Sequence, residues 1–218
     1  MNVKSGGGSI VAASARRRNP RGEGGRLRDD LVRAADRLLG ETGDVEGLSL
    51  RAVAREAGVT TPSIYLHFPD KGALVGAVVA ARFAELAEVV AAATRAVSDR
   101  SEQLEAGCLA YCQFGIDHPN AYRVLFGRSA SPRPDPTAEG APPETPLPAA
   151  FRFLIDGVTD RLRATGHGHA DAFRVATNVW VALHGLVTLR RAVGHFPWPS
   201  LIQQVRDVLS AFLGMSRT

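Results

Sequence analysis

From Leu27 onward the sequence repeats one pattern: apolar side chains recur every three or four residues, the spacing of one face of an α-helix. No segment shows the sustained alternation of apolar and polar residues that is typical of a half-buried β-strand. Aromatic residues make up only 6% of the chain, so the core is largely Ala, Val and Leu, which favours helices packed on helices. The sequence therefore predicts an all-α fold of about nine helices.

Caps and helix breakers set the expected ends of these helices. Ser49, Thr61 and Asp70 are natural N-caps, and Pro62 suits the first position of a helix. Helices are expected over residues 27–42, 49–57, 61–68, 71–96, 98–117, 119–127, 147–165, 169–193 and 198–214.

The positive charge of the chain is concentrated at its N-terminal end. Residues 1–28 carry seven basic side chains against one acidic one, a local charge of +6, whereas the whole chain carries +4. These residues are rich in Gly, Ser, Ala and Arg, so residues 1–25 are expected to form a disordered basic arm whose partner is a polyanion. A second irregular segment is expected at residues 128–146, because seven of the 13 prolines lie between Pro132 and Pro148.

Several classes of protein are disfavoured. The longest nearly apolar stretch, Val179 to Leu189, is about half of what a bilayer span needs, and no export signal is visible, so we expect a cytoplasmic protein with no membrane partner. Cys108 and Cys112 lie one helical turn apart and lack further ligands at suitable spacing, which favours core thiols over a disulfide framework or a metal site. We find no phosphate-binding loop, nucleophile elbow or paired carboxylates, and therefore predict no enzyme and no cofactor.

The helices at 49–57 and 61–68 are arranged as a helix-turn-helix. Gly58 supplies the left-handed backbone that a tight turn between helices needs, and Val59 fills the angle between them. The second helix presents short hydroxyl side chains outward, which suits base edges and phosphates in a major groove. The alternative is an ordinary helical hairpin on the protein surface.

The stretch from Leu50 to Leu74 resembles the helix-turn-helix signature of TetR-type bacterial transcriptional regulators. Its most specific part is Tyr65-x-His-Phe-x-x-Lys71-x-x-Leu74. The chain departs from the family pattern at Leu66, where an aromatic residue is frequent, and at Gly72, where a residue other than Gly is frequent. The resemblance implies a DNA-binding domain over residues 26–80, a divergent helical ligand-binding and dimerisation domain over residues 81–218, and a homodimer that represses transcription.

The resemblance also implies which residues contact double-stranded operator DNA. Short hydroxyl side chains are the candidates for base contact, and longer polar or cationic ones for phosphate contact. For His67 the alternative is a side chain that caps its helix, and for Lys71 a solvated surface charge. The candidate DNA-binding residues are Arg51, Thr60, Thr61, Pro62, Ser63, Tyr65, His67 and Lys71.

In the C-terminal half, the segment from Trp180 to Gly185 resembles the Trp-x-x-x-His-Gly element of one group of TetR-type C-terminal domains. Trp180 and His184 lie four residues apart on one helix face. The functional interpretation is a ligand pocket, and the alternative is plain core packing. The candidate ligand-binding residues are Tyr111, Phe114, Tyr122, Phe126, Phe173, Trp180 and His184.

The helix near 173–193 is apolar on nearly every side, so every side must be covered. Together with the helix at 198–214 it is expected to form a four-helix homodimer interface; the alternative is a central helix buried within one subunit. The side chains concerned are Val179, Val181, Leu183, Leu186, Val187 and Leu189, with Leu201, Val205, Val208 and Phe212.

Taken with the resemblance, these patterns predict a DNA-binding transcriptional regulator. It is expected to be a repressor that a small apolar or amphipathic ligand releases from its operator. The alternative is a dimeric ligand-binding or scaffolding protein that does not read DNA specifically.

Overall fold

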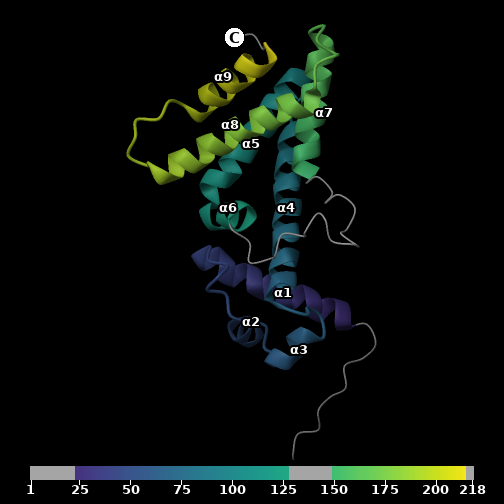
Figure 1. Cartoon of the computed structure of the whole chain (residues 1–218), viewed down its shortest axis with the longest axis vertical. Helices are drawn as coiled ribbons and strands as arrows, with labels where there is room; N and C mark the ends of the chain where they lie inside the picture. Colours follow the sequence, from purple (N-terminus) through teal and green to yellow (C-terminus); the bar gives the residue numbers. More distant parts are fainter. Residues whose placement is uncertain (1–22, 128–148, 215–218) are drawn as a thin grey trace, which may run out of the picture.

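The computed structural model describes residues 23–127 and 149–214, and within these ranges the chain forms nine α-helices and no β-strand (Figure 1). This confirms the all-α prediction. The helices are α1 (Glu23–Thr42), α2 (Leu50–Glu56), α3 (Thr61–Tyr65), α4 (Lys71–Arg95), α5 (Arg100–Asp117), α6 (Pro119–Phe126), α7 (Ala149–Ala164), α8 (Ala172–Ala192) and α9 (Leu201–Leu213).

The long helix α4 joins a small unit, α1–α3, to a larger bundle, α5–α9 (Figure 1). Its first half packs on α1, and its second half packs on α5 and α7. Each part has an apolar core of its own. Leu31, Ile64 and Leu74 are fully buried in the first core, and Leu183 and Leu209 are buried in the second.

Side-chain caps fix the start of three long helices. The Asp70 carboxylate accepts the N–H of Ala73 at 2.7 Å, as its position in the sequence predicts. Asp99 and Asp171 cap α5 and α8 in the same way. These carboxylates also lie at the positive ends of the helix dipoles, and this interaction stabilises the helices further.

The short helix α3 differs from its prediction at both ends. Thr60, not Thr61, is the N-cap, because Thr60 has extended backbone angles whereas Thr61 is already helical. The helix ends at Tyr65 instead of continuing to residue 68, and Leu66 is its C-cap. Ser49 precedes α2 as predicted, but its side chain makes no capping hydrogen bond.

The predicted N-terminal arm is shorter than its boundary of residue 25. Helix α1 begins at Glu23, so residues 23–25, the end of the predicted arm, are helical. The basic residues of the predicted arm, and the predicted Pro-rich segment 128–146, lie outside the described residues.

Among the described helices, only α8 has the length and mean hydropathy, 1.2, of a membrane-spanning helix. Val179, Leu183 and Val187 are buried on one side of it, where α8 packs against α5, α7 and α9. Val181 and Leu189 are exposed on the other side. Helix α8 is therefore packed as a core helix along one face and left uncovered along the opposite face.

The predicted interface on α9 needs one correction. Val205 is completely buried in the core of its own subunit, because it lies on the face of α9 that packs against α5 and α8. Phe212 is exposed as the prediction requires, and Ile202, which is not in the predicted set, is exposed as well.

Candidate functional site

Helices α2 and α3 form a helix-turn-helix whose turn is held by backbone bonds. Gly58 has φ +68°, a left-handed conformation that costs Gly less than other residues. The Val59 N–H donates to the Ala54 carbonyl at 2.9 Å, which closes the turn. Ile64 and Phe68 are buried beneath it. The position of α3 is therefore set by its buried face, and its outer face is free to make contacts.

The outer face of the helix-turn-helix carries the candidate DNA-binding residues. The side chain of Tyr65 is 55% exposed. The hydroxyl groups of Thr60 and Ser63 are hydrogen-bonded to each other at 2.9 Å across the first turn of α3. Of the other candidates, Arg51 and Pro62 are exposed, and Thr61, His67 and Lys71 are half-buried.

Lys71 is the first residue of α4, and its side chain also links this helix to another part of the chain. Its ammonium group donates to the Glu46 carbonyl at 2.6 Å, which ties α4 to the loop before α2. An ammonium group has three N–H donors, so two of them stay available for other acceptors.

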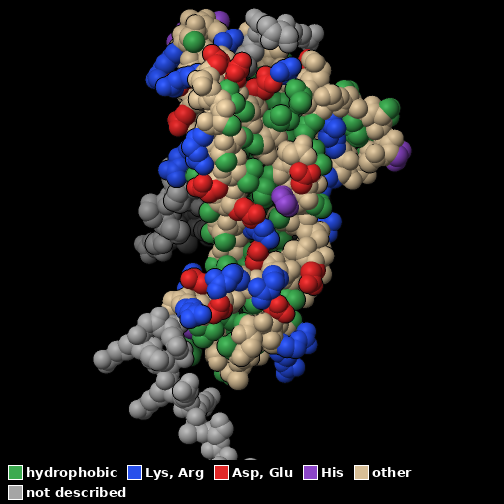
Figure 2. Space-filling model, turned by 180° about the vertical axis from the view of Figure 1, so that it is seen from behind, with side chains coloured by type: hydrophobic (Ala, Val, Ile, Leu, Met, Phe, Trp, Pro, Cys, Tyr) green, Lys and Arg blue, Asp and Glu red, His purple; other side chains and the backbone are tan. Residues whose placement is uncertain are grey.

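Arg55 is not among the residues that the family resemblance implies, although its spacing of four from Arg51 places both on one face of α2. Both are exposed, and neither side chain makes a hydrogen bond or ion pair within the described part of the chain. Figure 2 shows Lys and Arg side chains around the end of the molecule that α1–α3 form.

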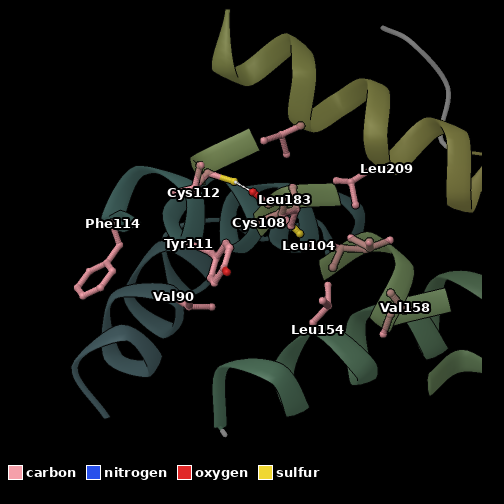
Figure 3. Packing of buried hydrophobic residues seen from close by; sticks show 14 of the residues in the cluster. Val90, Leu104, Cys108, Tyr111, Cys112, Phe114, Leu154, Val158, Leu183 and Leu209 are labelled. Carbon is pink, nitrogen blue, oxygen red and sulfur yellow. Dashed lines mark hydrogen bonds between the residues drawn. The ribbon is translucent and has the colours of Figure 1, made fainter. Parts of the chain in front are cut away.

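The bundle encloses a cavity of about 370 Å³. Figure 3 shows Val90, Tyr111 and Leu154 converging from three helices beside it. No Asp, Glu, Lys or Arg of the described chain lines the cavity. Its walls are Phe83, Leu86, Val90, Gly107, Cys108, Tyr111, Phe126, Ala150, Phe151, Phe153, Leu154, Phe173, Thr177, Trp180 and Leu183.

Four of the seven candidate ligand-binding residues lie in this wall: Tyr111, Phe126, Phe173 and Trp180. Phe173 is 53% exposed, so it stands at the edge of the cavity. Phe114, Tyr122 and His184 do not line the cavity. Phe114 packs instead against the His118 ring, at 5.0 Å between ring centroids.

Tyr122 and His184 nevertheless connect to the wall through hydrogen bonds. Trp180 Nε1 donates to the Tyr111 hydroxyl at 3.1 Å. The two Tyr hydroxyl groups are 2.8 Å apart, and the Tyr122 hydroxyl lies 2.6 Å from His184 Nδ1.

Burial shifts the pKa values of two members of this row of hydrogen bonds. It lowers the pKa of His184, so the imidazole is neutral at pH 7, and it raises the pKa of Tyr111 to about 12. Trp180 can only donate, so Tyr111 accepts from it; in the tautomer of neutral His184 that carries its proton on Nε2, Nδ1 accepts from Tyr122 and Tyr122 accepts from Tyr111.

The two cysteines are free and buried, and Cys108 forms part of the cavity wall. Burial raises the pKa of both thiols, that of Cys112 to about 12, so both are protonated at pH 7. Among the described residues, no group of His, Cys, Asp and Glu is arranged to hold a metal ion.

Both halves of the chain match known family models. The model described as "Bacterial regulatory proteins, tetR family" matches residues 31–78, and the one described as "Tetracyclin repressor-like, C-terminal domain" matches residues 104–213. The chain belongs to the TetR family.

A single named repressor of the TetR family matches part of this chain. The chain is 32% identical over 126 residues to the tetracycline repressor protein class A from transposon 1721 of Escherichia coli. That match covers 58% of this chain and 53% of the relative, so it spans about half of the repressor's length.

Two solved structures share the fold. A protein of unknown function from Rhodococcus sp. RHA1 is 28% identical, with a TM-score of 0.67 over 90% of this chain and 98% of that one. The transcriptional regulator FadR from Bacillus subtilis, solved in complex with stearoyl-CoA, is 14% identical, with a TM-score of 0.63 over 85% of this chain and 97% of that one. At 14% identity the second likeness concerns the fold alone.

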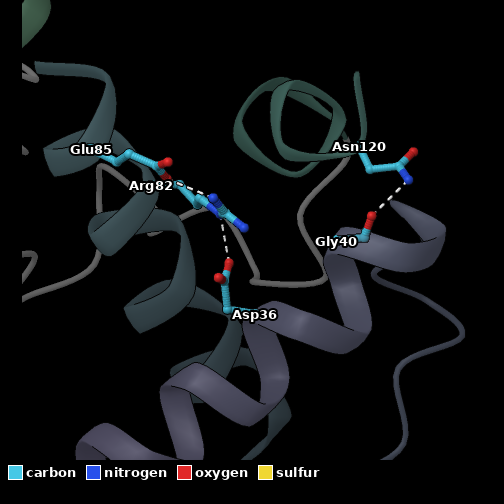
Figure 4. Close-up of polar contacts among 5 residues, drawn as sticks. All are labelled: Asp36, Gly40, Arg82, Glu85 and Asn120. Carbon is cyan, nitrogen blue, oxygen red and sulfur yellow. Dashed lines mark hydrogen bonds and ion pairs between the residues drawn. The ribbon is translucent and has the colours of Figure 1, made fainter. Parts of the chain in front are cut away.

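Helix α6 connects the two halves of this TetR-family chain. The Asn120 side chain donates to the carbonyls of Gly40 and Glu41 at 2.8 and 3.1 Å, in the last turn of α1 (Figure 4). Arg123 donates to the Thr42 carbonyl at 3.3 Å. These bonds satisfy carbonyls that a helix end leaves without a partner. Three residues further along α6, Phe126 lines the cavity.

Helix α4 makes a second connection. Arg82 donates to Asp36 of α1 and to Glu85 of its own helix, both at 2.6 Å (Figure 4). These groups are partly buried, so solvent screens the ion pair less than one at the open surface.

Proposed function

We propose that this chain is a transcriptional repressor that binds operator DNA as a homodimer and is released when a small molecule fills the cavity of the bundle. The observation that carries the proposal is the position of α6. One residue of this short helix, Phe126, lines the cavity, and two others, Asn120 and Arg123, are bonded to the end of α1. A change in the cavity therefore has a direct route to α1, the helix on which α2 packs, and α3 packs in turn on α2.

The DNA contacts are assigned to the outer face of α2 and α3. Thr61 and Ser63 meet base edges or phosphates, whereas Tyr65, His67 and Lys71 meet phosphates. Arg51 and Arg55 extend the cationic surface along α2.

The ligand is assigned to the cavity. Its volume of about 370 Å³ lies within the range of small-molecule sites, about 300–1,000 Å³. No charged side chain of the described residues lines it, so a buried ionic group would have no counter-charge there. An apolar or amphipathic molecule with an uncharged body fits this wall.

The dimer is assigned to the uncovered faces of α8 and α9. Val181 and Leu189 are exposed and lie eight residues apart, with Gly185 between them on the same face. A Cβ added to Gly185 would meet nothing within 4 Å, so a partner helix can approach closely there. Ile202 and Phe212 of α9 are exposed as well.

Release is a shift between two states. Bound to DNA, the two copies of α3 must fit successive major grooves, about 34–36 Å apart. A ligand that favours a different spacing lowers operator affinity, by no more than its own preference for that state. Such a regulator works in the cytoplasm, where the DNA lies.

Fluorescence anisotropy with the DNA upstream of the gene tests the DNA-binding part. Arg55→Ala should weaken binding to all sequences and reduce the salt slope by about one phosphate contact. Arg163→Ala is the matched control, because Arg163 is an exposed arginine on α7. If the unaltered protein binds this DNA no better than random DNA, the protein is instead a ligand-binding or scaffolding dimer.

A further inference from the structure

A second cavity lies beside the first, between the start of α5 and helix α7. Its volume is about 290 Å³. In contrast to the first, its wall includes charged side chains beside apolar surface. Its walls are Arg100, Ser101, Gln103, Leu104, Phe153, Asp156, Gly157, Asp160, Arg161 and Ala164.

Phe153 is the one residue of the described chain that lines both cavities. Its ring lies against the backbone of α5 at Gly107, where a Cβ added to Gly107 would overlap it. Helix α5 therefore leaves a place for this ring only because residue 107 has no side chain.

The Phe153 ring also lacks the contacts that hold the other rings of the first cavity. Phe126 packs against Phe83, and Phe151 packs against Phe173 and Trp180. Within the described residues Phe153 has no aromatic neighbour, and it is only half-buried. Turning this ring therefore breaks no aromatic pair, in contrast to turning Phe126 or Phe151.

Arg161, a residue of the wall of this second cavity, has a hydrogen-bond donor that lacks an acceptor. Arg161 Nε is buried and makes no hydrogen bond within the described structure. The other guanidinium nitrogens make only long bonds, both of 3.4 Å, to Ser101 Oγ and the Gly214 carbonyl. Arg100, on the other side of this cavity, is already paired with Asp160. A buried donor without a partner favours a ligand that brings a hydrogen-bond acceptor.

We propose that Phe153 is a movable partition, and that the ligand is an elongated amphiphile that spans both cavities. Its apolar body fills the first cavity, and its hydrogen-bond acceptor reaches Arg161 when the Phe153 ring turns aside. This inference rests on the proposed ligand-binding role of the first cavity. To that role it adds the shape of the ligand, the chemistry of its polar end and the residue that limits the length of the ligand.

A series of straight-chain primary alcohols of increasing length tests the partition, with binding measured by calorimetry. In the unaltered protein, affinity should rise about fourfold per methylene and then level off when the first cavity is full, because a longer chain gains affinity only after it has turned the Phe153 ring aside. In Phe153→Ala the rise should continue through longer chains, because the two cavities are joined. A plateau at the same length in both proteins would overturn the inference while leaving the ligand-binding role of the first cavity intact.

Arg161→Met tests the polar end. Added to Phe153→Ala, it should lower the affinity of the longest alcohol about tenfold, because the bond to the alcohol oxygen is lost. The matched control is Phe83→Ala, which enlarges the first cavity without joining it to the second. On that background Arg161→Met should lower the affinity of the same alcohol less, because the Phe153 ring must still turn aside before the alcohol reaches Arg161. An equal loss on both backgrounds would contradict the assigned polar end.

Thermal denaturation checks that each variant folds. If Phe153→Ala does not, Phe153→Leu gives a smaller opening, and the plateau should then shift less but in the same direction. Absence of alcohol binding in every variant and in the unaltered protein would overturn both this inference and the proposed ligand class.

Discussion

Trp180, Tyr111, Tyr122 and His184 form a hydrogen-bond chain in which each group has one role. Trp180 only donates, neutral His184 accepts at Nδ1, and each Tyr hydroxyl does both. Because Tyr111 and Tyr122 are buried, water cannot replace a lost member of the chain. The chain therefore stabilises the place where α5, α6 and α8 meet.

Tyr122→Phe should lower the free energy of unfolding by about 1–3 kcal/mol, because the Tyr111 hydroxyl and His184 Nδ1 both lose a partner while the ring volume is kept. Urea denaturation at a fixed protein concentration measures the change. Tyr65→Phe is the control, since the Tyr65 hydroxyl belongs to an exposed side chain and should not affect stability. Equal stabilities of the two variants would contradict a structural role for the chain.

The protein should lose stability as the pH falls below about 6.5, the usual pKa of His. Burial lowers the pKa of His184 in the folded state, so the unfolded state binds more protons in this range and protonation favours unfolding. The loss should level off at the lowered pKa. His184→Asn keeps an acceptor but does not titrate, so its stability should fall less between about pH 8 and pH 5. Identical pH profiles would mean that His184 titrates as in the unfolded chain.

How well single residues could be predicted depended on whether one helix or several set their position. Trp180 and His184 share a face of α8 by their spacing alone, and the structure links them through Tyr111 and Tyr122. Tyr122 lies outside the cavity wall because of the way in which α6 crosses α5 and α8. The pattern of a single helix does not show how helices cross. Phe153 could not be assigned for the same reason, since its place depends on Gly107 of another helix.

Helix α6 has only eight residues, yet it belongs to both apolar cores. Val124 is buried with α1–α4, and Tyr122 and Leu125 are buried in the bundle. A rigid helix with side chains in two cores transmits a displacement from one to the other, because neither core can deform without losing contacts. This makes α6 the element through which we expect the cavity and the DNA site to be coupled.

The double variant Asn120→Ala/Arg123→Ala should uncouple the two sites. In the unaltered protein, operator DNA should raise the midpoint of a ligand titration, and the ligand should weaken DNA binding by the same factor. Without the bonds from α6 to α1 this factor should move toward one, while ligand affinity in the absence of DNA stays the same. Gln113→Ala is the control, because within the described residues the Gln113 side chain is bonded only to Asp117 of its own helix. An undiminished factor in the double variant would place the coupling in α4 instead.

Helix positions could be predicted to within a few residues, since local signals end most of these helices. Asp70 and Pro119 act through their own backbone and side chain, so their effect is visible in the sequence. The start of α1 was misplaced because Gly24 and Gly25 have low helix propensity, yet the helix extends to Glu23. The end of α3 depends on how Phe68 is buried under α2 and α3, a tertiary contact that local propensity does not describe.

The proposed dimer determines whether the two helix-turn-helix units can reach one operator together. A single unit makes few base contacts, and pairing two units adds their binding energies at a fixed spacing. The uncovered faces of α8 and α9 lie on the bundle, at the far end of α4 from α1–α3 (Figure 1). Their separation from the DNA surface allows the same molecule to bind its partner and its operator at once.

Val181→Asp should convert the dimer into a folded monomer. The Val181 side chain is 62% exposed in a single subunit, so the substitution costs little within the monomer. In an apolar interface, however, it places an unpaired carboxylate against the partner helix, which is strongly unfavourable. Sedimentation velocity should therefore show a single subunit, and operator affinity should fall together with the dimer.

Val89→Asp is the matched control for this prediction, since Val89 is 38% exposed on α4 and outside the proposed interface. It makes the same chemical change on another helix surface, so it should leave both the dimer and operator binding unaffected. If Val181→Asp stays dimeric, another surface joins the subunits. If it becomes monomeric but keeps full operator affinity, one helix-turn-helix suffices, and a mechanism based on the spacing of two recognition helices cannot apply.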